Sequence, residues 1–284
     1  MKFFITGAGG QLGHELVRVA QENGHVVTST DHQSLDIIDR DAVLAAIGAA
    51  KPHVVIHAAA WTAVDACEGD RDKAMLVNGT ATKYVVDAAR LVGARVVYIS
   101  TDYVYDGTKP TPYIESDMVN PQSVYGESKL AGERALGAGD TIIRISWVCG
   151  FHGANMVKTI LKLGRTQNEL RFVDDQIGEP TFADDAALAI VKISEAGYSG
   201  IWHVTNQGVV SWYEFAREVL LAAGLDAAKV HPIKTVDLNP PRPAKRPANS
   251  VLANSAMISA GMPLLPDFRE PLARLVQRLM AHGH

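Results

Sequence analysis

The stretch KFFITGAGGQLG, Lys2–Gly13, decides the fold prediction for this chain. Its first half is short and apolar, which is typical of a buried strand, and its second half spaces Gly7, Gly10 and Gly13 three residues apart ahead of a helical pattern. Glycines at such a turn let a pyrophosphate approach the N–H groups of a helix N-terminus. A purely structural turn also uses glycine, so the prediction of a dinucleotide site depends on the elements that follow.

Apolar runs alternate with helical patterns through the first half of the chain. Four further runs are short, rich in β-branched residues and bounded by turn residues: HVVTST, HVVIHAA, RVVYIS and TIIRIS. Helical patterns lie between the runs, at residues 11–23, 39–49, 71–92 and 123–136. This alternation predicts an α/β fold with a Rossmann-type doubly wound parallel sheet, in which ligands bind beyond the carboxyl ends of the strands.

The second half of the chain follows a looser pattern. Helical patterns at residues 156–163, 183–196, 212–223 and 268–280 are separated by proline-rich loops such as NPPRPAKRP, which oppose regular structure. We therefore predict a dinucleotide-binding domain over residues 1–150 and a smaller C-terminal substrate-binding lobe over residues 151–284. Some segments of the lobe are expected to return to the first domain.

Composition argues against several classes of protein. The 284 residues carry a net charge of −4, which gives no basic footprint for nucleic acid, and no apolar run approaches the roughly 18 residues that cross a membrane. Cys67 and Cys149 make no disulfide framework, and the N-terminus leads straight into a strand and not into a secretory signal. The sequence predicts a cytoplasmic protein without a metal site; a homodimer is compatible with it.

Asp31 follows the second predicted strand, eighteen residues beyond Gly13. A carboxylate there can accept hydrogen bonds from an adenine ribose and would repel a 2′-phosphate, which favours NADH over NADPH. His32 follows directly, Arg18 or Arg40 could reach a phosphate, and Asp31 could also be only a turn residue. The cofactor is therefore predicted as NADPH or NADH.

Further predicted cofactor contacts come from loops and small residues. A loop after Asp31 could hold the adenine, three alanines after the third strand would let a flat ligand pass close to the backbone, and an asparagine amide could lie near the same site. Packing explains most of these residue types as well. The predicted cofactor-binding residues are Gly7, Gly10, Gln11, Leu12, Gly13, Asp31, Asp36, Ile37, Ala58, Ala59, Ala60, Asn78, Tyr125 and Lys129.

Tyr125 and Lys129 stand four residues apart in SVYGESKL, residues 123–130, and share one face if the segment is helical. An ammonium group near a phenol favours the phenolate and lowers the tyrosine pKa, which would tune a proton donor. An ordinary surface pair is the alternative interpretation. Thr101 ends the fourth predicted strand, where its hydroxyl could hold a carbonyl oxygen beside Tyr125.

Together these motifs resemble the extended short-chain dehydrogenase/reductase superfamily and, within it, the dTDP-4-dehydrorhamnose reductases. The resemblance runs from residue 7 to about residue 252 and is carried by GQLG, HAAAWTAVDACE, STDYVYDG, YGESKLAGE, RISWVCG, DDQIGEPT and RPANSVL. It implies reduction of the 4-keto group of dTDP-4-dehydrorhamnose, a nucleotide-linked 6-deoxy sugar, to dTDP-L-rhamnose by a nicotinamide cofactor.

The resemblance also implies roles for individual residues. Tyr125 would donate the proton to the nascent C4 alkoxide, Lys129 would lower its pKa and hold the nicotinamide ribose, and Thr101 would orient the carbonyl oxygen. Arg242 and Lys245 are weaker candidates for the substrate diphosphate. The implied substrate-binding residues are Thr101, Asp102, Tyr103, Trp147, Gln176 and Arg246.

Other members of the superfamily carry out different reactions. Tyr103 stands where the resembling dehydratases have a glutamate, which disfavours dehydration, and Trp61 and Cys149 stand where many relatives would have tyrosine. Two alternatives stay open: a reductase for another nucleotide-linked 4-keto sugar, and a non-catalytic regulatory subunit that binds a dinucleotide. The complete set of threonine, tyrosine and lysine favours catalysis.

Overall fold

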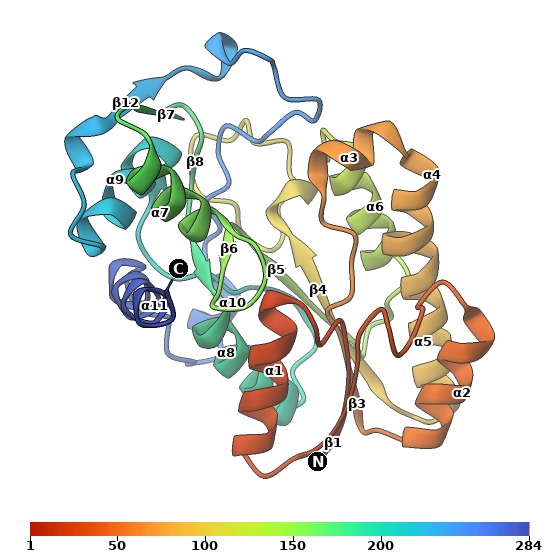
Figure 1. Cartoon of the computed structure of the whole chain (residues 1–284). Coiled ribbons are helices and arrows are strands. Elements are labelled where there is room, and N and C mark those ends of the chain that lie inside the picture. The colour runs from red at the N-terminus through yellow and green to blue at the C-terminus, as the bar shows by residue number, and fades with distance from the viewer. Residues whose placement is uncertain (284) are drawn as a thin grey trace.

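The computed structural model describes residues 1–283 and has a six-stranded parallel sheet at its centre (Figure 1). The strand order is β10-β5-β4-β3-β1-β2, so the order reverses between β1 and β3, the place where such sheets bind ligands. The strands are β1 Lys2–Thr6, β2 Val26–Thr30, β3 Val54–His57, β4 Arg95–Thr101, β5 Thr141–Ile145 and β10 Gly200–His203. The predicted Rossmann-type fold is confirmed.

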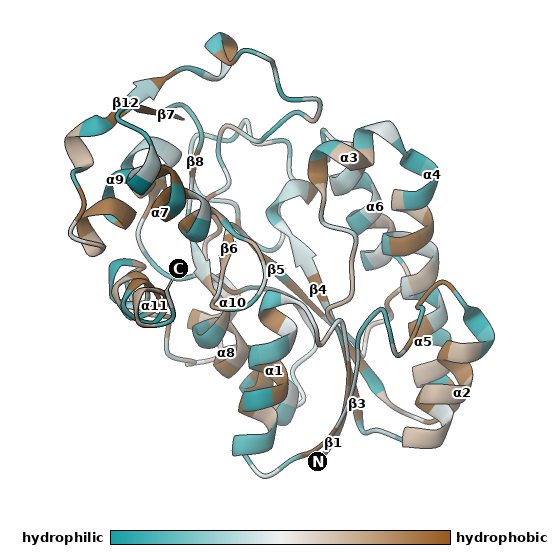
Figure 2. Cartoon of the chain, in the orientation of Figure 1, coloured by the Kyte–Doolittle hydropathy of each residue, from teal (hydrophilic) through white to brown (hydrophobic). Residues whose placement is uncertain are grey.

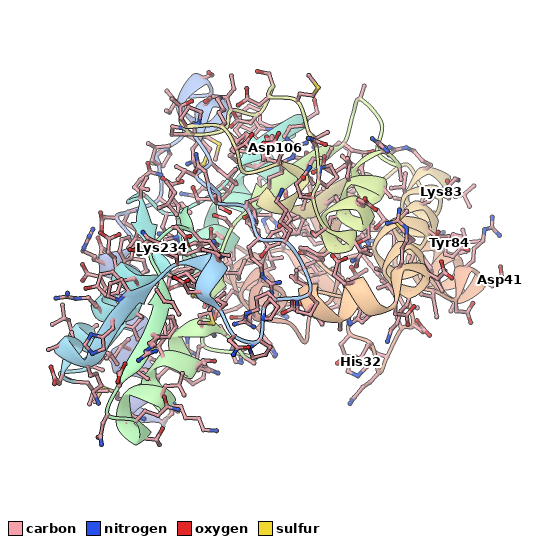
Figure 3. The ribbon with its side chains drawn as sticks, turned by 90° about the horizontal axis from the view of Figure 1, so that it is seen from above. His32, Asp41, Lys83, Tyr84, Asp106 and Lys234 are labelled. Carbon is pink, nitrogen blue, oxygen red and sulfur yellow. The ribbon has the colours of Figure 1, made fainter. Side chains whose placement is uncertain are left out.

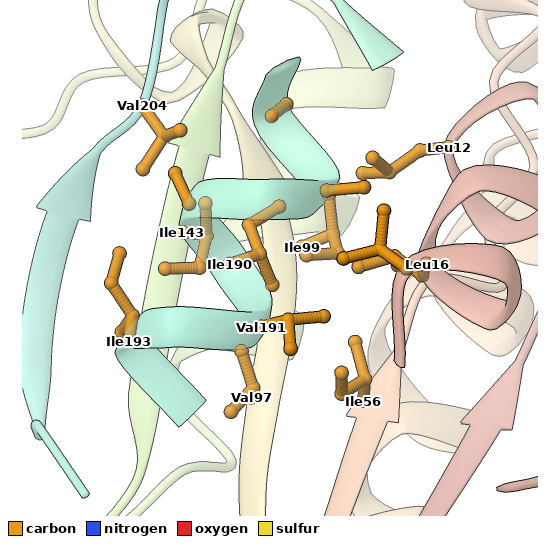
Figure 4. Close-up of a cluster of buried hydrophobic side chains, with 14 of the residues drawn as sticks. Leu12, Leu16, Ile56, Val97, Ile99, Ile143, Ile190, Val191, Ile193 and Val204 are labelled. Atoms are coloured by element: carbon orange, nitrogen blue, oxygen red, sulfur yellow. The ribbon is translucent and has the colours of Figure 1, made fainter. Parts of the chain in front are cut away.

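Helices cover both faces of the sheet because successive side chains on each strand point to opposite faces. Phe3 and Ile5 of β1 pack with α1 (Gln11–Glu22) and α8 (Ala183–Ala196), whereas Phe4 lies in the opposite cluster. Figure 4 shows Ile190 and Val191 of α8 facing Ile99 of β4 and Leu16 of α1. The helices of the opposite face are α2 (Arg40–Ala50) and α5 (Ala81–Leu91).

A second hydrophobic core lies outside the sheet. It joins α7 (Met156–Thr166), α9 (Trp212–Ala222) and α11 (Arg269–Ala281), which form the lobe to the left in Figure 1. The chain leaves this lobe to form α8 and β10 on the main sheet, and then re-enters it. In Figure 2 the apolar colouring follows the central strands and the inner faces of the helices.

The remaining elements are short. Two-stranded ladders pair β7 with β12, β8 with β11, and β6 with β9. Their strands are β6 Val148–Cys149, β7 Leu170–Val173, β8 Ile177–Gly178, β9 Thr181–Phe182, β11 Val210–Ser211 and β12 Val230–Ile233. The other helices are α3 Val64–Gly69, α4 Arg71–Ala74, α6 Val124–Glu133 and α10 Ser255–Ser259, with single turns at Asp102–Val104, Ala227–Lys229 and Thr235–Asp237.

Several features differ from the sequence prediction. β2 is an edge strand with no fully buried residue, so the expectation that it is buried is wrong. The helix expected at residues 71–92 is interrupted by a π-helical turn, Met75–Thr80. α3, α10, the sixth strand β10 of the main sheet and the strands of the short ladders were not predicted. No helix within residues 1–283 combines the length and apolar character of a membrane span.

Candidate active site

The glycine turn forms a cradle at the N-terminus of α1. Gly7 has a positive φ of 71°, and a Cβ atom on Gly13 would lie 2.1 Å from the carbonyl oxygen of Gly7. Helix α1 begins at Gln11 without a side-chain cap on its first N–H groups. The cradle therefore offers backbone donors at close range and fits the pyrophosphate of a dinucleotide.

A cavity of about 320 Å³ opens beyond the carboxyl ends of the strands. It gathers thirteen residues predicted for the site, from the glycine turn, the ends of β3, β4 and β5, and α6. These are Gly7, Gly10, Gln11, Leu12, Gly13, Ala58, Ala60, Thr101, Asp102, Tyr103, Tyr125, Lys129 and Trp147. Segments far apart in the sequence thus meet where a doubly wound sheet binds its ligand.

Helix α6 presents Tyr125 and Lys129 on one buried face, and Ser123 caps its N-terminus by accepting the N–H of Gly126 at 3.2 Å. The Nζ of Lys129 donates to the carbonyl oxygen of Ile99 at 2.7 Å and lies 4.1 Å from the ring centroid of Tyr98. Burial lowers the pKa of Lys129 to about 7, and the carboxylate of Glu133 opposes this fall. Lys129 is therefore balanced between its two protonation states near neutral pH.

The expectation that Lys129 lowers the pKa of Tyr125 is wrong for this structure. Burial raises the pKa of Tyr125 well above its usual value, and the nearby carboxylate of Asp102 raises it further. The ammonium group of Lys129 is directed at Ile99 and Tyr98 instead. Tyr125 is consequently held in its protonated form, which is the form that a proton donor needs.

Thr101 and Asp102 form a second polar unit of the cavity wall. The Thr101 hydroxyl donates to Oδ1 of Asp102 at 2.8 Å and accepts the N–H of Tyr103 at 3.2 Å. Oδ2 of Asp102 is buried and makes no hydrogen bond of good geometry among residues 1–283, although the side chain of Ser250 lies close enough to oppose the rise in the pKa of this carboxyl. Burial raises the pKa of Asp102 to about 6. An acceptor oxygen therefore remains for a polar group of a ligand.

A larger cavity of about 510 Å³ lies in the second lobe and shares Tyr103 with the first. Gln176, Trp212, Arg242 and Arg246 line it. The Arg246 guanidinium, predicted to meet a diphosphate, forms a two-pronged ion pair with Asp65 of α3. Lys245 does not line this cavity, and its Nζ donates to Oε1 of Gln122 at 3.2 Å.

Trp147 lies beside both cavities. Its ring lies parallel to that of Trp212, with 3.6 Å between centroids and an interplanar angle of 11°. Trp147 has a positive φ of 47°, which is strained for a large side chain, and a Cβ atom on Gly178 would lie 2.7 Å from the indole. Because Trp147 lines the first cavity and Trp212 the second, the stacked pair forms an aromatic wall between them.

Asp31 lines a third cavity together with Gly9, His14, Arg18 and Ser34. Its Oδ1 accepts the N–H of Gln33 and the N–H and hydroxyl groups of Ser34, which leaves Oδ2 to accept a further hydrogen bond. Arg18 is paired with Glu15 and Glu22. His32 extends away from the molecule in Figure 3. The carboxylate is thus available to a ribose hydroxyl at the end of β2.

Four predicted contacts lie outside these cavities. Asp36 accepts the N–H of Ile38 in its own loop, and Ile37 packs on the core below α2. Ala59 lies behind the glycine turn, where its backbone approaches Gly7. Asn78 is buried and bonds the backbone N–H and carbonyl of Trp61, because the π-helical turn directs its amide inward.

The structure adds lining residues that the sequence reasoning missed. Thr62 and Val64 follow β3, Ile99 and Ser100 are the last residues of β4 before Thr101, Ile145 ends β5, and Val148 begins β6. Their position at or just beyond the carboxyl ends of strands is the signal that could have identified them. Their apolar or small side chains carry no motif of their own.

A Rossmann-type sheet with a glycine cradle, and with threonine, tyrosine and lysine at the strand ends, defines a short-chain dehydrogenase/reductase. The family model of the RmlD substrate binding domain matches residues 1–281. The chain belongs to this family.

Individual relatives resemble the chain over nearly its whole length. It is 40% identical to a dTDP-4-dehydrorhamnose reductase of Burkholderia thailandensis, over 99% of this chain and 100% of that protein. The crystal structure of such a reductase from Clostridium acetobutylicum has a TM-score of 0.94 at 42% identity, covering 99% and 100% of the two chains. That of Bacillus anthracis, in complex with NADP, has a TM-score of 0.93 at 36% identity, covering 98% and 99%.

Proposed function

We propose that this protein reduces the 4-keto group of dTDP-4-dehydrorhamnose to give dTDP-L-rhamnose, with NADPH or NADH as the reductant. The observation that carries the proposal is the cavity in which the glycine cradle meets Thr101, Tyr125 and Lys129. Relatives of nearly equal length carry the name of this reductase, and one of them was crystallised with NADP. The bound nicotinamide supplies the hydride.

The side chains of the cavity have distinct roles in the proposed reaction. Tyr125, which burial keeps protonated, donates its hydroxyl proton to the C4 oxygen as negative charge develops there. Lys129, fixed by the carbonyl of Ile99, supplies positive charge beside the phenolate that results. Asp102 and Thr101 orient the sugar through their remaining hydrogen-bonding capacity.

We assign the two ends of the substrate to the two cavities that share Tyr103. The sugar lies in the first cavity, against Tyr103 and Trp147, and the nucleotide lies in the second, near Gln176 and Arg246. Aromatic rings supply large contact area, while guanidinium groups recognise phosphate oxygens. We also place the reaction in the cytoplasm, since both cysteines are free and buried, as is common in a reducing compartment.

The test is the absorbance of reduced nicotinamide with dTDP-4-dehydrorhamnose, for the native protein and the Tyr125→Phe variant. We expect oxidation that depends on the sugar. In the variant we expect turnover to fall by about 10²-fold or more, with nearly unchanged NADPH affinity. Normal turnover in Tyr125→Phe would refute the mechanism. Oxidation only with another 4-keto sugar would redirect the substrate assignment, and tight dinucleotide binding without any turnover would identify a regulatory protein.

A further inference from the structure

Residues 238–247, which we call the strap, cross from the second lobe to the mouth of the larger cavity. In Figure 3, Lys234 marks the end of β12, from which the chain runs on toward the strap. Leu238, Arg242 and Arg246 of the strap line this cavity. Ala244 is buried, so the strap is fixed in place near its middle.

Asp65 makes most of the polar contacts that fix the strap. Its Oδ1 accepts the backbone N–H of Ala244 at 3.1 Å, and its two oxygens receive both terminal nitrogens of Arg246, with Nη2 to Oδ2 at 2.8 Å. Arg242 lies 3.7 Å from the same carboxylate. Asp65 belongs to the first turn of α3, directly after Val64, which lines the smaller cavity. One carboxylate therefore connects the walls of both cavities.

The pairing leaves Arg246 able to bind a further anion. A guanidinium has five N–H donors, and Asp65 and the carbonyl of Ala244 use three of them. The N–H donor on Nε and the second donor on Nη2 have no hydrogen-bond partner among residues 1–283. Two guanidinium groups, those of Arg242 and Arg246, face the carboxylate of Asp65, and the charge of Glu68 also acts on Arg246.

The anchored guanidinium is also close to the catalytic tyrosine. The positive charge of Arg246 opposes the rise that burial causes in the pKa of Tyr103. The ring of Tyr103 packs edge-on against that of Tyr125, with 5.4 Å between centroids. A phosphate bound at Arg246 would thus lie one aromatic ring away from the proposed proton donor. Small displacements of Arg246 would move the attached sugar relative to Tyr125.

We infer that Asp65 is a positioning residue that fixes Arg246 and the strap to receive the diphosphate of a nucleoside diphosphate or nucleotide sugar. This inference rests on the proposed function and extends it to a residue that does not itself contact the substrate. Holding the strap in advance spares the bound nucleotide the entropy loss of ordering it. The carboxylate aids anion binding although its own charge is negative.

Because the carboxylate of Asp65 would itself repel a phosphate, the Asp65→Asn variant distinguishes a positioning role from a purely electrostatic one. The variant keeps the side-chain size and makes the cluster more positive, so a purely electrostatic role predicts tighter diphosphate binding. The positioning role predicts weaker binding, by about tenfold, because the strap loses its charge-assisted anchor. The two interpretations therefore differ in the direction of the change.

The experiment is calorimetric titration of the full chain with dTDP at saturating NADPH. We expect about tenfold weaker dTDP binding in Asp65→Asn, unchanged NADPH affinity, and no additional loss when Asp65→Asn is combined with Arg246→Met. Glu218→Gln, which removes another carboxylate from an arginine pair away from these cavities, is the matched control and should bind dTDP normally. Melting temperatures of all variants identify any general loss of folding.

Three results would contradict the inference. Equal or tighter dTDP binding in Asp65→Asn would remove Asp65 as the anchor and leave the reductase assignment untouched. Full additivity of the two substitutions would show that Asp65 does not act through Arg246. Failure of the native protein to bind dTDP would overturn the nucleotide-sugar assignment together with the anchor.

Discussion

Replacing Lys129 with methionine should abolish activity and yet stabilise the fold at neutral pH. Lys129 is 2% exposed, and burial lowers its pKa from 10.5 to about 7. Between these two values the unfolded chain binds more protons than the folded chain, so the stability of the native protein rises with pH in this window. The difference of about 3.5 pKa units corresponds to about 5 kcal/mol in full.

The magnitude at each pH follows from linkage. Relative to a neutral side chain, the protonation equilibrium of Lys129 destabilises the native protein by about 4 kcal/mol at pH 7 and by about 2 kcal/mol at pH 9. Methionine has a similar reach without charge, but it gives up the hydrogen bond to Ile99 and the contact with the Tyr98 ring, at about 1–3 kcal/mol. Lys129→Met should therefore gain about 1–3 kcal/mol at pH 7 and close to nothing at pH 9.

The assay is urea and thermal unfolding of the native protein and the variant from pH 6 to pH 9. For a chain of this length, each kcal/mol moves the melting temperature by about 2 °C, so we expect a rise of about 2–6 °C at pH 7. Lys83→Met is the control, because Lys83 is 62% exposed on α5 at the periphery (Figure 3). A Lys129→Met variant that is less stable at pH 7, or a gain that does not shrink toward pH 9, would refute the reasoning.

Two further predictions concern the cofactor and the buried ion pair. Asp31→Ala should shift the ratio of kcat/KM values for NADPH and NADH severalfold toward NADPH, because the carboxylate of Asp31 no longer repels a 2′-phosphate. Steady-state kinetics with both cofactors test this prediction, and an unchanged ratio would remove Asp31 from the cofactor site. Arg144→Met should lower the free energy of unfolding by about 3–5 kcal/mol, since Arg144 and Glu133 are 2% and 4% exposed and the carboxylate loses its partner. Urea unfolding measures this loss of free energy, which should be smaller in the double variant that also carries Glu133→Gln. A loss below about 1 kcal/mol in Arg144→Met would mean that the buried pair behaves like a surface pair.

Local sequence patterns predicted five of the six strands of the central sheet because each of the five is a short apolar run bounded by turn residues. The glycine turn and the strand ends were predictable for the same reason: chain order alone brings them to one edge of a parallel sheet. β2 was misjudged because its apolar run lies at the sheet edge, and the run itself does not reveal how many neighbours a strand has. β10 was missed because its four residues, Gly200–His203, pair only through a long-range return of the chain.

The interactions around the site could not be predicted from local patterns. The inward turn of Asn78 requires the π-helical turn, and the pairing of Asp65 with Arg246 joins residues 181 positions apart. The spacing of Tyr125 and Lys129 suggested a mutual pKa effect, but burial depends on all the elements packed above and below α6. Spacing places side chains on one face; it does not determine which atoms they finally contact.

The return of α8 and β10 to the main sheet has a consequence for engineering. A fragment ending near residue 150 would lack β10 and expose the outer edge of β5. The unpaired backbone groups of this edge could then pair with a strand of another molecule and cause aggregation. A single crossover at that point, made to exchange the second lobe between relatives, would likewise pack the α8 of one relative against the α1 of another. Chimeras with altered sugar preference should instead exchange at least two separate segments and keep residues 183–203 with the sheet.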